Sequence, residues 1–256
     1  MRYLALAAVT AFTLSAPLIA PAQTKEVTLI APGGIRSAVE QLIPGFERQT
    51  GIKVKATFGS GLGTKKQVTQ GEAFDVPIVQ PPYPELLASG NVIGTSATPL
   101  ASVAVGVAVK KGAPKPDIST PEAVKRMLLA AKSITYPSPA GGAAAGVSFQ
   151  DTLKQMGIAD QVMPRIKLAQ GGAAAMEMTA KGEAEIGLTF VSEMNEPGID
   201  IVGPLPRAIS TPTSLVGFLS AHAKDPAAAK ALLTYLSSPA AAAAYKAQNM
   251  QPASAH

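Results

Sequence analysis

The chain has 256 residues, of which 47% are hydrophobic and 15% charged, with a formal net charge of +5. It is too apolar and too weakly charged for a disordered chain, and it is long enough for one large or two medium-sized units. The lack of cysteine excludes disulfides and thiolate metal sites, and His222 and His256 are too few for a multi-histidine site. Aromatic residues make up only 5%, which argues against stacking platforms for nucleic acid. We therefore expect no metal, no cofactor and no nucleic-acid partner.

Residues 1–22 have the features of a secretory signal peptide. A short basic start precedes an apolar run over residues 4–14, and Ala20 and Ala22 are the small residues that a signal peptidase recognises. Pro17 interrupts the run, which is short for a membrane span. We expect cleavage after Ala22, release into the bacterial periplasm and no stable membrane insertion. Retention as a membrane anchor is the alternative.

Strand and helix patterns alternate along the mature chain. Apolar or alternating runs predict strands at Val27–Ala31, Ile52–Phe58, Val76–Val79, Leu100–Val109, Ile134–Tyr136, Ile186–Val191, Ile199–Val202 and Ser214–Ser220. Helical spacing and capping residues predict helices from Ile35, from near Thr64, over Pro121–Ala131 and Ala144–Met156, up to Lys181, and from Pro226 and Pro239. This alternation predicts an α/β fold with mostly parallel sheets.

Two long apolar strands divide these units into groups. We expect residues 101–109 and 213–221 to be hinge strands, residues 23–100 and 222–256 to form lobe 1, and residues 110–212 to form lobe 2. In such sheets ligands bind beyond the carboxyl ends of the strands. The expected molecule is a two-lobed monomer with its ligand cleft between the lobes.

Turns rich in Gly and Ser follow the strands and open the helices, at residues 32–37, 59–65, 137–145 and 171–173. The first turn of a helix has free N–H groups and the positive end of the helix dipole. If several of these turns converge on one cleft, they make an anion site without a metal or cofactor.

The same turns lie in the strings VTLIAPGGIRSAVEQLIPGFERQTGIKVKATFGSG, QVTQGEAFDVPIV, ITYPSPAGGAAAGV and GGAAAMEMTAKGEAEIGLTFVSE. Here the sequence resembles the type II periplasmic substrate-binding proteins, in the molybdate-binding branch that also includes aconitate isomerase-like proteins. The resemblance implies two α/β lobes, a two-strand hinge, closure on a ligand and an ABC permease as partner. It is fairly specific for the fold family, and no single string identifies the ligand.

The resemblance also implies positions for a ligand site. Gly34 stands where oxyanion-binding relatives carry a serine in the first turn. In the second turn these relatives carry a pair of serines, and here Ser60 is followed by Gly61. The tyrosine of some molybdate binders is not evident near Thr189. The expected ligand-binding residues are Gly33, Gly34, Arg36, Ser60, Gly61, Lys65, Ser138, Ala140, Gly172, Ala173, Phe190 and Ser192. With fewer hydroxyl donors, molybdate is less favoured than the resemblance alone suggests.

Positive charge stands beside these turns instead. Arg36, Lys65 and Lys66 follow the first two turns, where Arg can hold a carboxylate in a fork and Lys as a point charge. We interpret them as favouring an organic di- or tricarboxylate over an oxyanion, and expect Arg36→Ala to weaken binding. Solvated helix residues are the alternative interpretation.

Three functions remain open. The first is a binding protein that delivers an anion to a permease, and the second is a cofactor-independent isomerase of a polycarboxylate such as aconitate. The third is a sensor or binder without a transporter. An isomerase needs a base, and the candidates are Glu193, Tyr136, Lys65 and, more remotely, Glu177. Each also fits a structural role, as a surface carboxylate, a packed aromatic or a solvated lysine.

Overall fold

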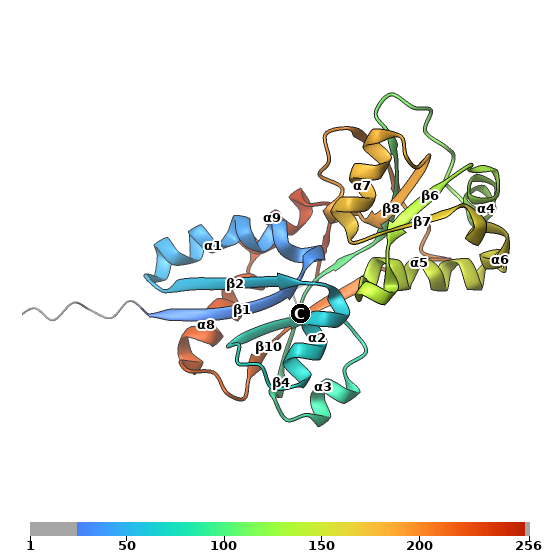
Figure 1. The fold of residues 1–256 in the computed structure, drawn as a ribbon. Coiled ribbons are helices and arrows are strands. Elements are labelled where there is room, and N and C mark those ends of the chain that lie inside the picture. The colour runs from blue at the N-terminus through green and yellow to red at the C-terminus, as the bar shows by residue number, and fades with distance from the viewer. Residues whose placement is uncertain (1–24, 254–256) are drawn as a thin grey trace, which may run out of the picture.

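The computed structural model describes residues 25–253, which form two α/β lobes side by side (Figure 1). The expected signal peptide, residues 1–22, lies outside the described residues. Lobe 1 contains a six-stranded sheet in the order β11-β4-β10-β3-β1-β2, and lobe 2 a five-stranded sheet in the order β7-β6-β8-β5-β9. No helix within residues 25–253 has the length and apolar character needed to cross a membrane.

The strands of lobe 1 are β1 (Glu26–Pro32), β2 (Lys53–Gly59), β3 (Val76–Val79), β4 (Val92–Val103), β10 (Thr213–Ser220) and β11 (Gln251–Pro252). Its helices are η1 (Gly33–Ile35), α1 (Arg36–Thr50), α2 (Gly61–Thr69), α3 (Pro84–Ala88), α8 (Pro226–Leu236) and α9 (Pro239–Ala247). The strands of lobe 2 are β5 (Val105–Lys110), β6 (Ile134–Pro137), β7 (Ile166–Ala169), β8 (Ile186–Phe190) and β9 (Ile199–Pro204). Its helices are α4 (Pro121–Ala130), η2 (Pro139–Gly141), α5 (Ala144–Gln155), α6 (Ala159–Val162), η3 (Met163–Arg165), α7 (Gly172–Lys181) and η4 (Val191–Glu193).

Both sheets are mixed, whereas the sequence predicted mostly parallel ones. The strands joined through helices are parallel, as β1 is to β2 and β3, and β6 to β7 and β8. The strands at the lobe junction run antiparallel to their neighbours, as β10 does to β3 and β4, and β5 to β8 and β9. The difference arises because the chain enters β5 and β10 directly from the other lobe, without a crossover helix.

The chain crosses between the lobes at two places. The single strand expected at 100–109 is two strands separated by Ala104, one in each sheet. The strand expected as the second hinge element, β10, lies wholly in the sheet of lobe 1, so the return crossing is the segment 205–212. Backbone bonds join the two crossings to lobe 2, from Val191 N–H to the Ala104 carbonyl at 3.0 Å and from Leu205 N–H to the Val105 carbonyl at 2.9 Å.

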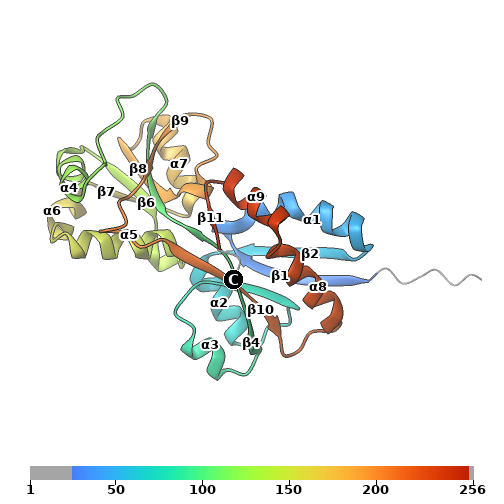
Figure 2. The ribbon, with the colours of Figure 1, turned by 180° about the vertical axis from the view of Figure 1, so that it is seen from behind.

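Helices cover both faces of the lobe 1 sheet (Figures 1 and 2), and buried apolar side chains pack beneath them. Helices α1, α8 and α9 pack against one face. Helices α2 and α3 cover the other face over a separate buried cluster of Ile30, Val68, Val79, Leu86, Val92, Val216 and Phe218. Strand β3 is buried at all four positions. The next residue, Gln80, directly follows its carboxyl end, where the two lobes meet.

Side-chain caps begin several helices where the sequence predicts them. Thr120 Oγ1 accepts from Ala123 N–H at 3.1 Å, and Asp225 Oδ1 accepts from Ala228 N–H at 3.0 Å. Helix α2 begins at Gly61 rather than near Thr64, because Ser60 caps it by accepting from Gly63 N–H at 3.2 Å. The earlier start places the N-terminus of α2 at the end of β2, beside the other turns.

Candidate functional site

The four Gly-rich turns meet between the lobes and enclose a cavity of about 180 Å³. This cleft is smaller than the roughly 300–1,000 Å³ of pockets for drug-sized ligands, so it fits a small molecule. It is lined by Pro32, Gly33, Gly34, Gly59, Ser60, Gly61, Gln80, Pro137, Gly141, Ala143, Ala144, Ala145, Gln170, Gly171, Gly172, Phe190 and Glu193.

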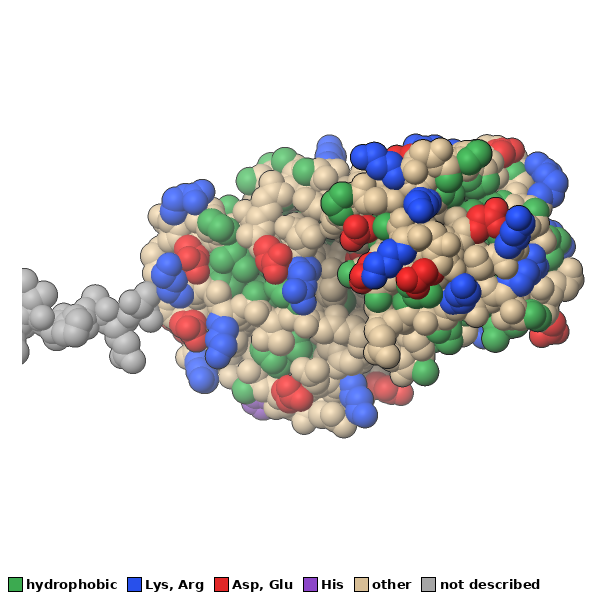
Figure 3. All heavy atoms as spheres, turned by 45° about the horizontal axis from the view of Figure 1, so that its top comes forward, with side chains coloured by type: hydrophobic (Ala, Val, Ile, Leu, Met, Phe, Trp, Pro, Cys, Tyr) green, Lys and Arg blue, Asp and Glu red, His purple; other side chains and the backbone are tan. Residues whose placement is uncertain are grey.

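Helix N-termini supply the positive potential of the cleft. The lining residues include the first residues of η1, α2, α5 and α7. N–H groups in the first turn of a helix have no partner within the helix, and the dipole favours a negative ligand there. None of the lining residues is a lysine or arginine. On the face of the molecule that Figure 3 shows, Lys, Arg, Asp and Glu side chains are interspersed.

Glu193 brings a carboxyl group into this cleft from the turn η4. Its Oε2 accepts from Thr189 Oγ1 at 2.5 Å, within lobe 2. Burial raises the pKa of Glu193, and the hydrogen bonds from Thr189 and from the Phe190 backbone oppose that rise without cancelling it. The carboxyl therefore keeps its proton to a higher pH than an ordinary glutamate.

Two glycines make room for this carboxyl group. A Cβ on Gly33 would stand 3.3 Å from Glu193 Oε1. A Cβ on Gly172 would collide with Glu193 Oε2 and would stand 2.6 Å from Thr189 Oγ1. Glu193 therefore lies between the N-terminus of η1 in lobe 1 and that of α7 in lobe 2.

The lobes touch each other around the cleft. Leu62 N–H, in α2, donates to the Gly142 carbonyl of lobe 2 at 3.0 Å. Ser192 Oγ, in η4, donates to the Gly34 carbonyl of lobe 1 at 2.7 Å, and this bond is buried. These contacts describe a closed arrangement of the lobes.

Seven of the residues singled out from the sequence line the cleft: Gly33, Gly34, Ser60, Gly61, Gly172, Phe190 and Glu193. Ser192 lies beside it, with its hydroxyl proton directed at Gly34. Ser138, Ala140 and Ala173 belong to the same turns but are not among the lining residues. Glu193 is the one acid–base group among the lining residues. Its position just after strand β8 lets its side chain face the cleft.

The positive residues and Tyr136 are held elsewhere. The exposed Arg36 has its guanidinium 4.8 Å from the centre of the Phe58 ring. Lys65 Nζ donates to the Pro82 carbonyl at 3.0 Å, and partial burial lowers its pKa. Tyr136 is fully buried in lobe 2, where its hydroxyl accepts from Gln150 Nε2 at 3.2 Å. Arg36 and Lys65, expected from the sequence to bind the ligand, are thus not among the lining residues of the cleft, and each contacts groups outside it.

The other remote candidate, Glu177, lies on the exposed face of α7. It pairs with Lys181 at 2.6 Å, and that hydrogen bond lowers its pKa. Glu177 therefore lies on a solvated helix face, as its position in the helix predicts.

Sequence reasoning missed two polar residues of the lining, Gln80 and Gln170. Both directly follow a strand, β3 for Gln80 and β7 for Gln170. A polar residue directly after the carboxyl end of a strand is the pattern that would have found them. Gln80 is 3% exposed, and neither its Oε1 nor its Nε2 has a hydrogen-bond partner.

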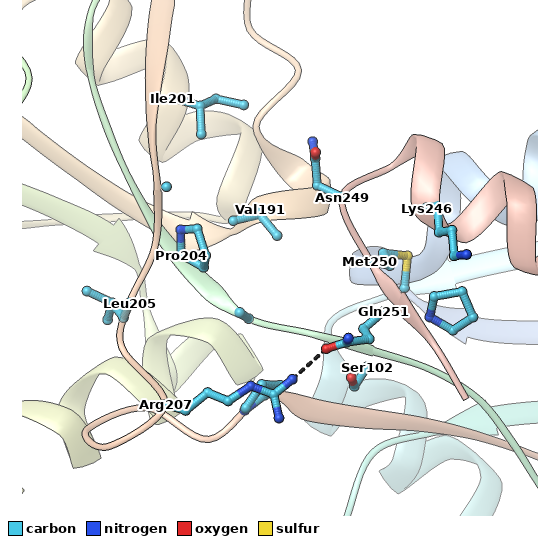
Figure 4. Close-up of a pocket in the computed structure, with 14 residues that line it drawn as sticks. Ser102, Val191, Ile201, Pro204, Leu205, Arg207, Lys246, Asn249, Met250 and Gln251 are labelled. Atoms are coloured by element: carbon cyan, nitrogen blue, oxygen red, sulfur yellow. Dashed lines mark hydrogen bonds between the residues drawn. The ribbon is translucent and has the colours of Figure 1, made fainter. Parts of the chain in front are cut away.

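A second cavity, of about 630 Å³, is lined by residues of both crossings (Figure 4). It is a groove between residues 201–207 on one side and residues 246–252 on the other. Arg207 Nη2 donates across it to Gln251 Oε1. Val191 lines this groove, while Glu193 of the same short turn lines the cleft, so η4 separates the two cavities.

The family model of bacterial extracellular solute-binding proteins matches residues 27–251. The chain belongs to this family. It is 31% identical over 254 residues to an aconitate isomerase of a Pseudomonas species, covering 93% of this chain and 92% of that one. It is 28% identical over 242 residues to a molybdate-binding protein of Azotobacter vinelandii, covering 91% and 93%.

Solved structures confirm the type II periplasmic binding protein fold. The periplasmic molybdate-binding protein of Azotobacter vinelandii superposes with a TM-score of 0.73 at 21% identity, over 90% of this chain and 100% of that one. The sulfate-binding protein SubI of Mycobacterium tuberculosis superposes with a TM-score of 0.69 at 18% identity, over 89% and 87%. Within residues 25–253, no three His, Asp or Glu residues are grouped as metal ligands.

Proposed function

We propose that this solute-binding protein captures a small organic acid, with di- and tricarboxylates first, in the cleft between its lobes. It works as a monomer in the periplasm and delivers the acid to an ABC permease. The helix N-termini at the cleft support an anionic ligand, and the lobe contacts support closure around it. The extracellular assignment of the family supports export.

The Glu193 carboxyl carries the preference for an organic acid. Molybdate and sulfate are fully ionised near neutral pH and only accept hydrogen bonds, so an ionised carboxylate in the same small cavity repels them. An organic acid can place a carboxylate at the helix N-termini and an uncharged part of its skeleton against Glu193. The raised pKa of Glu193 further lets its carboxyl share a proton with a ligand of that class.

Isothermal titration calorimetry of the mature chain tests this proposal. The panel is molybdate, sulfate, phosphate, succinate, malate, citrate and both isomers of aconitate. We expect the tightest binding among the organic acids. Glu193→Gln removes the negative charge and should strengthen sulfate binding relative to wild type, whereas Glu177→Gln, on the exposed face of α7, should not. Molybdate or sulfate binding more tightly than every organic acid would overturn the proposal.

A second function is favoured by the same residue: a cofactor-independent isomerase of an unsaturated polycarboxylate. Glu193 is a buried carboxyl of raised pKa at the cleft, which suits a general base near neutral pH. The carboxylate would take a proton from a CH₂ group next to the C=C bond, leaving an allylic carbanion. It would return the proton to the far alkene carbon, so the double bond moves without net redox change. The Pseudomonas relative, named an aconitate isomerase, supports this candidate.

Nuclear magnetic resonance in D₂O separates carrier from isomerase. An isomerase converts cis- to trans-aconitate and incorporates deuterium at the CH₂ carbon, and Glu193→Gln abolishes conversion while binding persists. Glu177→Gln keeps conversion at the wild-type rate. Binding of aconitate with no conversion and no exchange over many hours excludes the isomerase and leaves the carrier.

A further inference from the structure

Gln80 is a buried polar side chain in the cleft without a hydrogen-bond partner. It is 3% exposed, and both its amide oxygen and its amide nitrogen are unsatisfied. Burying such groups without hydrogen bonds is costly, and most buried polar atoms in proteins are paired. Because Gln80 lines the cleft, a ligand bound there can supply the partners that the protein does not.

The surroundings of Gln80 show why its own chain cannot supply the missing partners. The next two residues, Pro81 and Pro82, have no N–H to donate to the side-chain oxygen. On the cleft side, Oε1 stands against Gly61 at the N-terminus of α2, where a Cβ would collide with it. The same Cβ would stand 2.8 Å from Ala144 Cβ of lobe 2, so the amide lies where the lobes meet.

A primary amide presents one acceptor and one donor side by side. A bare oxyanion such as sulfate offers only acceptors, so it satisfies Nε2 and leaves Oε1 unpaired. A hydroxyl or an un-ionised carboxyl both donates and accepts, and it satisfies both amide atoms. Glu193 is the one titratable side chain among the lining residues, and it approaches the cleft from η4 in the other lobe.

We propose that Gln80 is the residue by which this protein selects its ligand, through a group that both donates and accepts a hydrogen bond. The ligand class is then an organic acid with a hydroxyl, or with one carboxyl that stays protonated, placed at the N-terminus of α2. This rests on the proposed organic-acid function but not on whether the acid is carried or isomerised.

The test uses Gln80→Met, which keeps the length of the side chain and removes both amide atoms. Because an unsatisfied buried group disappears, we expect the ligand-free variant to melt about 2–4 °C higher than wild type. Gln70→Met, at an exposed position just after α2, is the matched control and should not raise the melting temperature. A lower melting temperature for Gln80→Met shows that the amide is bonded in the empty protein and overturns the inference.

Ligand selectivity is the second measurement, with two pairs of probes that differ by one hydroxyl: malate against succinate, and citrate against tricarballylate. If the group is a hydroxyl, wild type prefers the hydroxy acid by about tenfold or more, and Gln80→Met loses that preference. If it is a protonated carboxyl, wild-type affinity for both members falls as the pH rises from 5 to 8. That fall is at least tenfold smaller in Gln80→Met.

A change of less than twofold in both the preference and the pH dependence overturns the assignment. Should Gln80→Met fail to fold, Gln80→Leu also removes both amide atoms and adds no charge. It should lose at least tenfold in affinity for the preferred probe, and unchanged affinity overturns the inference. If no probe binds wild type, the organic-acid function fails, whereas the melting comparison still decides whether the amide awaits a partner.

Discussion

Ser192 Oγ donates a buried hydrogen bond of 2.7 Å to the carbonyl oxygen of Gly34, joining lobe 2 to lobe 1 at the edge of the cleft. Because the partners belong to different lobes, an opening of the cleft at this edge would break this bond. An interaction present in one of two conformations shifts the balance between them by its own free energy. The bond therefore acts on closure, and through closure on ligand affinity.

Ser192→Ala should weaken ligand binding by about fivefold, as the loss of about 1 kcal/mol for a buried hydrogen bond implies. Calorimetry gives the affinity, and small-angle scattering should show a more open ligand-free protein. Ser89→Ala is the matched control, since Ser89 Oγ donates to Leu86 at 2.7 Å inside lobe 1. Equal affinities for wild type and Ser192→Ala would show that the bond does not govern closure.

Glu193→Gln should make the protein more stable at neutral pH. Burial raises the pKa of Glu193 in the folded state, so the folded protein holds this proton to a higher pH than the unfolded chain. The free energy of unfolding therefore falls as the pH rises from the unfolded pKa through the folded one, and below the unfolded pKa the residue has no effect. Glutamine does not titrate and escapes this loss.

Denaturant unfolding at pH 3, 5 and 7 measures this difference. The stability gained by Glu193→Gln should be absent at pH 3 and largest at pH 7. Glu177→Gln serves as control, because the pKa of Glu177 is lowered by Lys181 and its loss cannot stabilise the protein at pH 7. If Glu193→Gln raised the free energy of unfolding equally at all three pH values, packing rather than titration would be the cause.

Gly172→Ala should destabilise the ligand-free protein, because the new methyl group collides with Glu193 Oε2 and crowds Thr189 Oγ1. Forced overpacking of this kind costs about 1–3 kcal/mol. At the neighbouring Gly171, a Cβ meets no heavy atom within 4 Å and the φ of −176° is open to any residue, so Gly171→Ala is the control. Thermal unfolding of both variants checks the pair, and equal melting temperatures would contradict the placement of Glu193.

Arg36→Ala and Lys65→Ala should each change ligand affinity by less than about threefold. Neither side chain lines the cleft, because Arg36 lies over the Phe58 ring and Lys65 donates to the Pro82 carbonyl. Calorimetry with the preferred acid measures both variants. A loss of tenfold or more for Arg36→Ala would restore the interpretation that its guanidinium holds a carboxylate.

The alternation of strands and helices, the capping residues and the turns at strand ends were predictable because they depend on local chemistry. Strand β3, the cap at Thr120 and the helices opened by Pro226 and Pro239 lie where local pattern places them. The break at Ala104 was not predictable, because the apolar run continues through it while its two halves join different sheets. The mixed pairing escaped prediction for the same reason, since strand direction is set by which lobe the chain comes from.

By itself, the sequence determined the alternation of strands and helices and the Gly-rich turns that open helices at strand ends, since these are local features. The tertiary structure alone decided which side chains face the cleft. It brought Glu193 from lobe 2 against Gly33 of lobe 1 and left Gln80 buried without a partner, while Arg36 was held over Phe58. These relationships join residues far apart in the chain. They depend on how the lobes close, which no local pattern of residues records.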